Sequence, residues 1–464
     1  MNKSNWLEKE LSECKFKDKR LDKRFKQLMT SIDSNQGKTL PQACGSWSEA
    51  KATYRFLSNE RVDESEILSG HFLNTAERIR ATNGPVLILH DTTEFTYHRD
   101  NPDDIGLIQK TPHIGKHSSG IKTDYKVCGI LMHASLAVTS EGLPLGLTST
   151  RYWSRKVFKN TNQLKRRVNM TRLPIEKKES IKWLQNMESS ISLAGSNPSK
   201  MIHIGDREND IYEYYCKCQE LDSYFIVRAC VNRLANESTL VEEVGSQKVY
   251  AKQRIEFIDK DGVLISTTLD IRVKRVELHP PIGKQAKYPD LTVFFISAIE
   301  AEVPKNRAQI KWSFITNLPV NSKKDIKQVL DWYKQRWKIE TYFKILKSGL
   351  KVEESKLRTA GRLSRLISMC CILAWRIHWL TFLNRESEKM SPSIAFDDVE
   401  IKIISTSFKK HKLDTLQDFI TRLAILGGYM NRKNDPPPGN SIIWRGLNKL
   451  HELKSGFLLA NICG

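Results

Sequence analysis

The sequence predicts an α/β protein: a central α/β region that carries an inserted antiparallel β module and is flanked by helical N- and C-terminal domains. Three observations predict this class. Short apolar runs alternate with helical patterns between about 85 and 229, polar and apolar residues alternate between about 232 and 320, and both ends are charged and helical. We expect domains at 1–72, 73–380 and 381–464, with the β insertion at 232–320.

The N-terminal region is strongly basic and has a helical pattern. Its cations, interleaved with acids, are Lys15, Lys17, Lys19, Arg20, Lys23, Arg24 and Lys26. The whole chain of 464 residues has a formal net charge of +21, which favours a polyanionic partner. We therefore expect Arg20, Lys23 and Arg24 to bind the DNA backbone, the alternative being a solvated helix face. Residues 37–46 are expected to form a connection and 48–57 a second helix.

Two aspartates end short apolar segments in the central region. Asp91 follows the continuous apolar run Val86–Leu89, and Asp206 follows Met201–Ile204. Such runs are typical of strands buried on both faces, and sites in α/β sheets lie at the carboxyl ends of strands. The alternative for Asp206 is a helix cap. A helix at 208–220 and a strand at 224–229 continue the pattern, and a basic stretch covers 151–178.

The region between 232 and 320 has a different pattern. Segments 254–258 and 269–273 alternate polar and apolar residues, with turn residues at 259–262 and Pro280-Pro281. We interpret it as antiparallel strands inserted into the α/β region. Helical patterns return from Lys323 onward.

The segment Asp331–Gly349 predicts one helix with a functional face. At about 100° per residue, four polar side chains share an arc of about 60° beside an apolar stripe. They are Tyr333, Arg336, Glu340 and Lys347. The alternative is a salt-bridged solvent face, because Arg336 and Glu340 form an i,i+4 pair.

Three acids brought together indicate a divalent metal site. Asp91, Asp206 and Glu340 offer the oxygen ligands that magnesium prefers, and such sites catalyse phosphoryl transfer. A zinc site is not expected, since the 9 cysteines form no paired CxxC set. The N-terminus has no apolar signal core, and Leu366–Leu383 is interrupted by Arg376 and His378, which favours a buried helix over a membrane span.

These motifs resemble those of the IS-four family of bacterial DDE transposases. The set Tyr333, Arg336, Glu340 and Lys347 matches the family's Y-(2)-R-(3)-E-(6)-K signature, and the segments 90–97 (HDTTEFTY) and 204–210 (IGDREND) resemble its two aspartate motifs. The segments 54–57, 311–320 and 443–460 also resemble the family. The N-terminal region matches only loosely, and 151–172 is more basic than expected.

The resemblance implies a ribonuclease-H-like catalytic core, with Asp91, Asp206 and Glu340 holding Mg²⁺, for which Mn²⁺ substitutes. It implies cut-and-paste transposition through a DNA hairpin, with double-stranded transposon ends and target DNA as partners. It also implies a homodimer in the paired-end complex, formed by the C-terminal helices, and a cytoplasmic, nucleoid-associated location without membrane contact.

The resemblance also assigns DNA contacts. Tyr333, Arg336 and Lys347 would bind phosphates, and Trp312 matches the position that receives a base flipped out of the stack. We further expect Arg55 and Arg228 to bind DNA. For Trp312 the alternative is a core residue. Two other functions stay open: a nuclease or junction resolvase without strand transfer, and a non-catalytic DNA-binding protein or transposition inhibitor.

Overall fold

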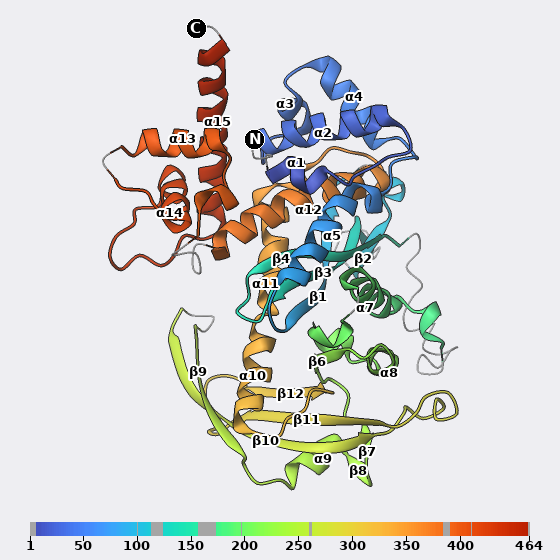
Figure 1. Cartoon of the computed structure of the whole chain (residues 1–464). Coiled ribbons are helices and arrows are strands. Elements are labelled where there is room, and N and C mark those ends of the chain that lie inside the picture. The colour runs from blue at the N-terminus through green and yellow to red at the C-terminus, as the bar shows by residue number, and fades with distance from the viewer. Residues whose placement is uncertain are drawn as a thin grey trace, which may run out of the picture.

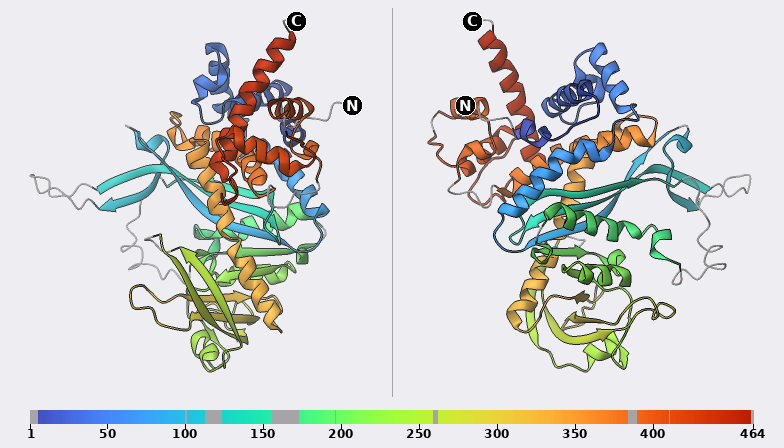
Figure 2. Two further views of the ribbon diagram at one scale, coloured as in Figure 1. Left: turned by 90° about the vertical axis from the view of Figure 1, so that its left-hand side faces the viewer. Right: turned by 45° about the vertical axis from the view of Figure 1, so that its right-hand side comes forward.

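The computed structural model describes residues 6–99, 101–112, 124–155, 173–195, 197–258, 262–383, 390–409 and 411–462. It is a mixed α/β protein. The N-terminal and C-terminal helices gather at one end of the molecule, and the strands of the later β region lie at the opposite end (Figure 1). Both further views show the same arrangement (Figure 2).

Five helices form the N-terminal region. They are α1 (Trp6–Leu11), α2 (Lys19–Ser34), α3 (Leu40–Cys44), α4 (Trp47–Leu57) and α5 (Glu64–Ala81). Helix α2 buries Phe25, Leu28 and Ile32, spaced three and four residues apart, while Arg20 and Lys23 on its other side are exposed. Asp18 caps this helix by accepting a hydrogen bond from the Arg20 backbone N–H.

The expected connection at 37–46 is wrong in one respect, because it contains α3. Thr39 and Gln42 form a capping box, and Pro41 stands in the first turn, where its missing N–H has no cost. Gly37 and Gly45 bound the helix with φ angles of 79° and 72°. A short helix therefore fits between two glycine turns.

Twelve strands of the described residues form one sheet, in the order β2-β3-β1-β5-β6-β12-β11-β10-β7-β8, with β4 on β3 and β9 on β10. Their bounds are β1 (Val86–Tyr97), β2 (Leu107–Pro112), β3 (Asp124–Thr139), β4 (Pro144–Trp153), β5 (Met201–Gly205), β6 (Tyr224–Arg228), β7 (Leu234–Ala235), β8 (Ser238–Thr239), β9 (Ala251–Ile258), β10 (Leu264–Leu278), β11 (Leu291–Glu300) and β12 (Lys311–Thr316). Strands β1, β5 and β6 are parallel, and the other pairs are antiparallel.

The centre of the sheet is covered by helices on both faces. Val86 and Ile88 of β1 pack in the same core as Trp183 of α7 (Ile181–Ala194) and Tyr214 of α8 (Tyr212–Glu220). Leu87 and Leu89 pack with the helices that follow the β region. All four residues of this run are fully buried, which explains why it is apolar without alternation.

The β insertion extends the central sheet instead of forming a separate one. Strand β12 pairs antiparallel with β6, placing Phe314 opposite Arg228, and β11, β10 and β9 follow outward. The short helix α9 (Leu240–Gly245) packs on β10 and β11. Hydrogen bonding is therefore continuous from the aspartate-bearing strands into the insertion.

Helices form the rest of the chain. They are α10 (Lys323–Lys334), α11 (Trp337–Lys344), α12 (Ala360–Leu383), α13 (Asp398–Ser407), α14 (Leu416–Leu426) and α15 (Asn440–Ile462). Helix α12 is long and apolar enough to cross a membrane, but 89% of its most apolar stretch is buried inside the protein. Its buried Arg376 lies 3.8 Å from Asp33 of α2 and 3.6 Å from Glu400 of α13. The expectation of a buried helix is confirmed.

The single α-helix expected at 331–349 is wrong. Helix α10 ends at Lys334, α11 begins at Trp337, and a π-helical turn covers Ile345–Gly349. The backbone N–H groups of Arg336 and Ile339 bond to carbonyls three residues back, so the chain tightens there and widens at the π turn. The four polar residues therefore lie on three connected segments: α10, α11 with the turn before it, and the π turn.

Two of the expected segments lie partly outside the described residues. Of the basic stretch 151–178, residues 156–172 lie outside the described residues, as do residues 259–261 of the expected turn at 259–262. The expected domain boundary after residue 72 falls inside α5, and the one after residue 380 falls inside α12.

Candidate active site

Asp91 and Asp206 lie at the same level of two neighbouring strands. Strands β1 and β5 are adjacent and parallel, and their last paired residues are Leu89 and Ile204. Each aspartate stands two residues after that pair. Asp206 therefore follows the carboxyl end of β5, where α/β proteins build their sites. Asp91 instead lies inside β1, which continues to Tyr97 because residues 91–97 pair with β3, so the expectation that Asp91 ends its strand is wrong.

Asp206 also caps a turn. Its Oδ1 accepts a hydrogen bond of 2.9 Å from the backbone N–H of Glu208, at the start of the 3₁₀ turn Arg207–Asn209. The cap interpretation is thus geometrically correct. A cap uses one oxygen of the carboxylate, which leaves the second for another ligand.

Arg336 connects the other two acids. Its Nη1 lies 3.3 Å from Oδ2 of Asp91, and its Nη2 lies 2.6 Å from Oε1 of Glu340. Only 11% of the Arg336 side chain is exposed. The expected i,i+4 pair with Glu340 therefore exists, but it lies in the site and reaches Asp91 instead of forming a solvent face.

The pKa of Asp91 reflects mainly the burial of its carboxylate. Burial raises the pKa of Asp91 to about 7, and the nearby charges of Asp206 and Glu340 act in the same direction. The Thr92 N–H, 2.7 Å from Oδ1, and Arg336 act in the opposite direction. Burial is thus the main reason that ionisation of Asp91 is disfavoured, the two other acids add to it, and a nearby cation would oppose both effects.

Tyr333 and Arg228 adjoin this cluster. The Tyr333 ring packs edge-on against Phe314 at 4.6 Å between centroids, and burial raises the pKa of its hydroxyl. Arg336 and Arg228 favour the ionised form of that hydroxyl. Arg228 ends β6, and burial lowers its pKa. Both expected DNA-binding residues therefore lie within electrostatic range of Arg336.

Lys347 approaches the site from the π turn. Its Nζ lies 5.7 Å from the ring centroid of Phe95 on β1, a cation–π contact. Phe95 follows Asp91 on the same strand. The lysine is thus held beside the strand that carries the first aspartate.

Trp312 lines a cavity in the β insertion. It is half-buried on β12, and the cavity of about 630 Å³ is also lined by Arg254, Ile255, Glu256, Phe257, Ile310 and Lys334. Trp312 contacts Phe314 at 6.5 Å between centroids, and Phe314 contacts Tyr333. A row of aromatic contacts therefore connects the cavity to the acidic cluster.

The basic residues expected in the N-terminal region lie on helices away from the acids. Arg20 and Lys23 are exposed on α2, Arg24 is half-buried there, and Arg55 is exposed on α4. The Arg20 guanidinium is 90% exposed and pairs with Asp18 at 2.8 Å. Arg20, Lys23 and Arg55 are thus accessible from solvent.

Lys182 also lies within electrostatic range of Asp206, although no motif predicts it. Its Nζ lies 4.8 Å from the Trp153 ring centroid and 3.9 Å from Oε2 of Glu208, and its side chain is only 12% exposed. Burial lowers its pKa, and Asp206 is among the charges acting against this shift. Lys182 belongs to no recognisable spacing pattern, so only the packing of α7 against β3, β4 and α8 reveals it.

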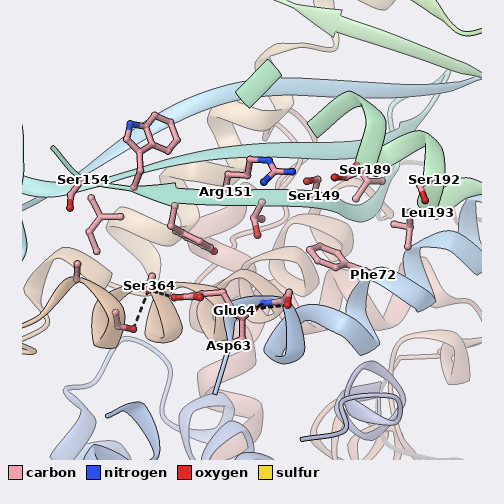
Figure 3. Close-up of a pocket in the computed structure, with 18 residues that line it drawn as sticks. Asp63, Glu64, Phe72, Ser149, Arg151, Ser154, Ser189, Ser192, Leu193 and Ser364 are labelled. Carbon is pink, nitrogen blue, oxygen red and sulfur yellow. Dashed lines mark hydrogen bonds between the residues drawn. The ribbon is translucent and has the colours of Figure 1, made fainter. Parts of the chain in front are cut away.

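A second hollow lies elsewhere, between β4, α5, α7 and α12. This cavity of about 690 Å³ is lined by Arg151 and several serines, including Ser149, Ser189 and Ser364 (Figure 3). None of the expected site residues lines it. The acidic cluster lies where β5 ends beside β1 and is therefore separate from this hollow.

The donor set fits a divalent cation. Among the described residues, no three His, Cys, Asp or Glu side chains are preassembled around one ion position. Arg336 lies against two of the acids, where it compensates their charge. Carboxylate oxygens nevertheless match hard divalent ions, and the raised pKa of Asp91 indicates the charge that such an ion would balance.

Two family models match the chain. Residues 3–62 match a transposase DNA-binding family, and residues 202–376 match the transposase DDE domain family. The chain is a DDE transposase. The DDE match includes Asp206 and Glu340 but not Asp91, and the DNA-binding match includes the cations of α2 and α4.

As a DDE transposase, the protein is a metal-dependent enzyme that cleaves DNA and transfers strands. DNA is its partner, and its DDE domain uses divalent ions. These findings favour the strand-transfer enzyme over the nuclease and the non-catalytic protein considered above.

Proposed function

We propose that this transposase moves DNA by cut and paste and frees each transposon end through a hairpin intermediate. The proposal extends the family assignment to the IS-four family and to similarity with the Tn-five (insertion sequence fifty) transposase. Its fold would be a ribonuclease-H-like core made from β1 and β3–β6, with β7–β12 inserted between Asp206 and Glu340. It would act in the cytoplasm of a bacterial host, on nucleoid DNA.

Asp91, Asp206 and Glu340 would hold the catalytic ions, Mg²⁺ with Mn²⁺ as a substitute. When bound, such ions activate the attacking oxygen and stabilise the leaving oxygen of a phosphoryl transfer. Two observations support this assignment: Asp91 and Asp206 each stand two residues after the last pair of the parallel strands β1 and β5, and Arg336 contacts both Asp91 and Glu340.

Four transfers at phosphorus follow from one site. Water first cuts one strand, and the freed 3′-hydroxyl attacks the opposite strand, which closes a hairpin on the transposon end. A second water opens the hairpin, and the same 3′-hydroxyl then joins target DNA. Each step forms one P–O bond and breaks one, so the same carboxylates serve all four.

Tyr333, Arg336 and Lys347 would bind the phosphates beside the cut. Arginine suits this because its forked donors match two phosphate oxygens. In the DNA-free protein the same fork contacts Asp91 and Glu340. A phosphate could therefore compete with the acids for Arg336, and Arg228 beside Tyr333 would extend the contact along the strand.

The Trp312 cavity is the single observation that carries the hairpin step. Closing a hairpin bends the strand sharply, and unstacking one base costs a few kcal/mol. A half-buried tryptophan that lines an open cavity can offset this cost by stacking on the base, worth about 1–3 kcal/mol. Trp312 both packs against the main hydrophobic core and lines this cavity.

Pairing of two transposon ends would use the C-terminal helices. Leu458 and Leu459 near the end of α15 are 46% and 64% exposed, and this helix extends beyond the neighbouring elements (Figure 1). Apolar side chains exposed on a projecting helix fit contact with a second copy. We propose a homodimer in the paired-end complex.

The test separates nicking from hairpin formation. Trp312→Ala should leave first-strand nicking near the wild-type rate and slow hairpin formation roughly ten- to a hundredfold, because only the second step needs the unstacked base. Nicked DNA should accumulate on a denaturing gel. An abasic nucleotide at the flipped position should partly restore the rate.

Tyr250→Ala is the matched control. Tyr250 is an exposed aromatic residue just before β9 and does not line the cavity, so its removal should leave both steps unchanged. Equal losses of nicking and hairpin formation in Trp312→Ala, or no relief from the abasic substrate, would instead make Trp312 a packing residue.

A further inference from the structure

The cavity that contains Trp312 has a second aromatic residue. Phe257 of β9 also lines it, although the two residues belong to strands separated by β10 and β11 in the sheet. Phe257 is only half-buried, and it stands near the end of β9 that faces the turn to β10. An aromatic face left partly uncovered inside a cavity is available to a ligand.

A buried ion pair supports the Phe257 ring. The guanidinium carbon of Arg307 lies 5.3 Å from the Phe257 ring centroid, within cation–π range. Arg307 Nη1 donates to Oε2 of Glu300 at 2.8 Å, and Nη2 contacts the other oxygen of that carboxylate. Glu300 ends β11 and is 3% exposed. The Glu300 side of the ion pair is therefore anchored in the sheet.

Glu300 also orders the loop that carries Arg307. Its Oε2 accepts the Ile310 backbone N–H at 3.1 Å, and its backbone carbonyl accepts from Gln309 at 2.8 Å. Arg307 lowers the pKa of Glu300 to about 2, so the pair is ionised at neutral pH. The bidentate contact leaves the guanidinium little freedom to move away from Phe257.

We propose that Phe257 is a second base-contacting residue of this cavity and that the Glu300–Arg307 ion pair positions its ring. The inference rests on the proposed hairpin function, because it gives the flipped base two aromatic walls. The ligand class is an unstacked nucleobase: aromatic faces suit its ring, and the charged groups of Arg254, Glu256 and Lys334 at the same cavity suit its polar edge. Because Arg254 pairs with Glu256 and Lys334 with Asp331, an apolar peptide would have to cover these ion pairs without hydrogen-bonding to them.

The experiment uses the full chain on a pre-nicked transposon end with 2-aminopurine at the flipped position. In wild type, stacking inside the cavity should quench the fluorescence that unstacking releases. On this substrate Phe257→Ala should slow hairpin formation about tenfold and leave the probe brighter. Phe257→Tyr, which retains the aromatic face, should restore both readouts. On an intact end Phe257→Ala should nick at the wild-type rate.

Arg307→Lys tests the positioning role. It keeps the positive charge beside Glu300 but loses the planar fork, so it should slow hairpin formation less than Phe257→Ala does. If Arg307 acts through Phe257, the double variant should be no slower than Phe257→Ala alone. Additive losses would overturn the positioning role, since they would mean that Arg307 acts independently of the ring.

The outcomes distinguish this inference from the function on which it rests. If wild type forms no hairpin, or Trp312→Ala forms it at the normal rate, the proposed function fails. If Trp312→Ala is slow while Phe257→Ala and Phe257→Leu match wild type, only the second wall fails. Phe257→Leu decides the matter if the alanine variant unfolds, because leucine keeps most of the apolar volume and lacks the aromatic face.

Discussion

Arg336 and Asp91 lie 245 residues apart in the chain and meet at 3.3 Å. The same guanidinium also contacts Glu340, so one cation compensates two of the three acids proposed to bind metal. In the DNA-free protein, the positive charge of the buried Arg336 offsets the repulsion between Asp91 and Glu340. These contacts also hold a phosphate-binding group next to the reacting atoms.

Removal of a single acid should abolish chemistry and spare binding. Asp91→Asn or Glu340→Gln should reduce cleavage in magnesium below detection, because each amide replaces a charged oxygen ligand by a neutral group. Affinity for transposon ends, measured by gel shift, should change little, since it depends mainly on contacts between cations and phosphates elsewhere.

Asp331→Asn is the control for this pair. Asp331 lies on α10 close to the site in sequence, but it is half-exposed and pairs with Lys334. Cleavage should survive this change. If cleavage also survived Asp91→Asn, the assignment of the metal ligands would be wrong.

End binding should depend steeply on salt through the surface of α2. Each neutralised phosphate releases counterions and contributes roughly −0.9 to the log–log slope of affinity against salt. Replacing Arg20, Lys23 and Arg24 by glutamine should weaken binding and flatten that slope. The measurement is a titration of labelled DNA at several salt concentrations.

Lys412→Gln is a suitable comparison, because this lysine is 87% exposed, pairs with Asp414 and lies outside the DNA-binding family match. Its slope should equal that of wild type. An unchanged slope in the triple variant would mean that the α2 surface is only solvated.

Assembly should depend on the exposed end of α15. Leu458→Ser combined with Leu459→Ser should leave binding of single ends intact and suppress both dimer formation and cleavage, because exposed leucines stabilise contacts only between copies. Sedimentation with end DNA measures the assembly. Dimers of normal stability would place the interface elsewhere.

Deleting the chain from Ser441 onward would not test dimer formation by itself. Ile443, Leu447 and Leu450 in the first part of α15 are fully buried, and Asn448 donates to the Gln36 carbonyl of the N-terminal region. Deleting them would expose the core and unfold the protein. Substitutions at the exposed end avoid this cost.

Acid should destabilise the fold through buried histidines, and His378 offers a clean case. Burial lowers the pKa of His378 from 6.5 to about 3, so the folded protein keeps it neutral while the unfolded chain protonates it. The stability that it contributes is present above pH 6.5 and is lost as the pH falls towards 3. At pH 5 the loss is about 2 kcal/mol.

His378→Phe should therefore flatten the decline of stability between pH 6.5 and 5, measured by urea unfolding. Neither ring nitrogen of His378 has a hydrogen-bond partner among the described residues, and the ring packs against Phe382, so phenylalanine fits the site. His411→Phe, at an exposed position, should leave the decline unchanged. An equal decline in His378→Phe and wild type would contradict the argument.

The sequence by itself determined the elements whose signals are local. Fully buried runs such as Val86–Leu89 are apolar at every position, so the strands that carry or precede Asp91 and Asp206 could be predicted, and so could the position of Asp206 after a strand end. The continuation of β1 beyond Asp91 depends on its pairing with β3 and could not be predicted in this way. The set Tyr333, Arg336, Glu340 and Lys347 could be recognised from the spacing of its members along the chain alone. The features that could be predicted depend on neighbours a few residues away.

The tertiary structure decided what depends on distant partners. The break between α10 and α11, the pairing of β12 with β6 and the contact of Arg336 with Asp91 all arise from packing between segments far apart in the chain. Lys182 and Phe257 gave no local signal, because a lysine or a phenylalanine acquires a role only from the groups brought against it. Periodicity records which face of an element is buried, whereas the partner on that face is chosen by the whole fold.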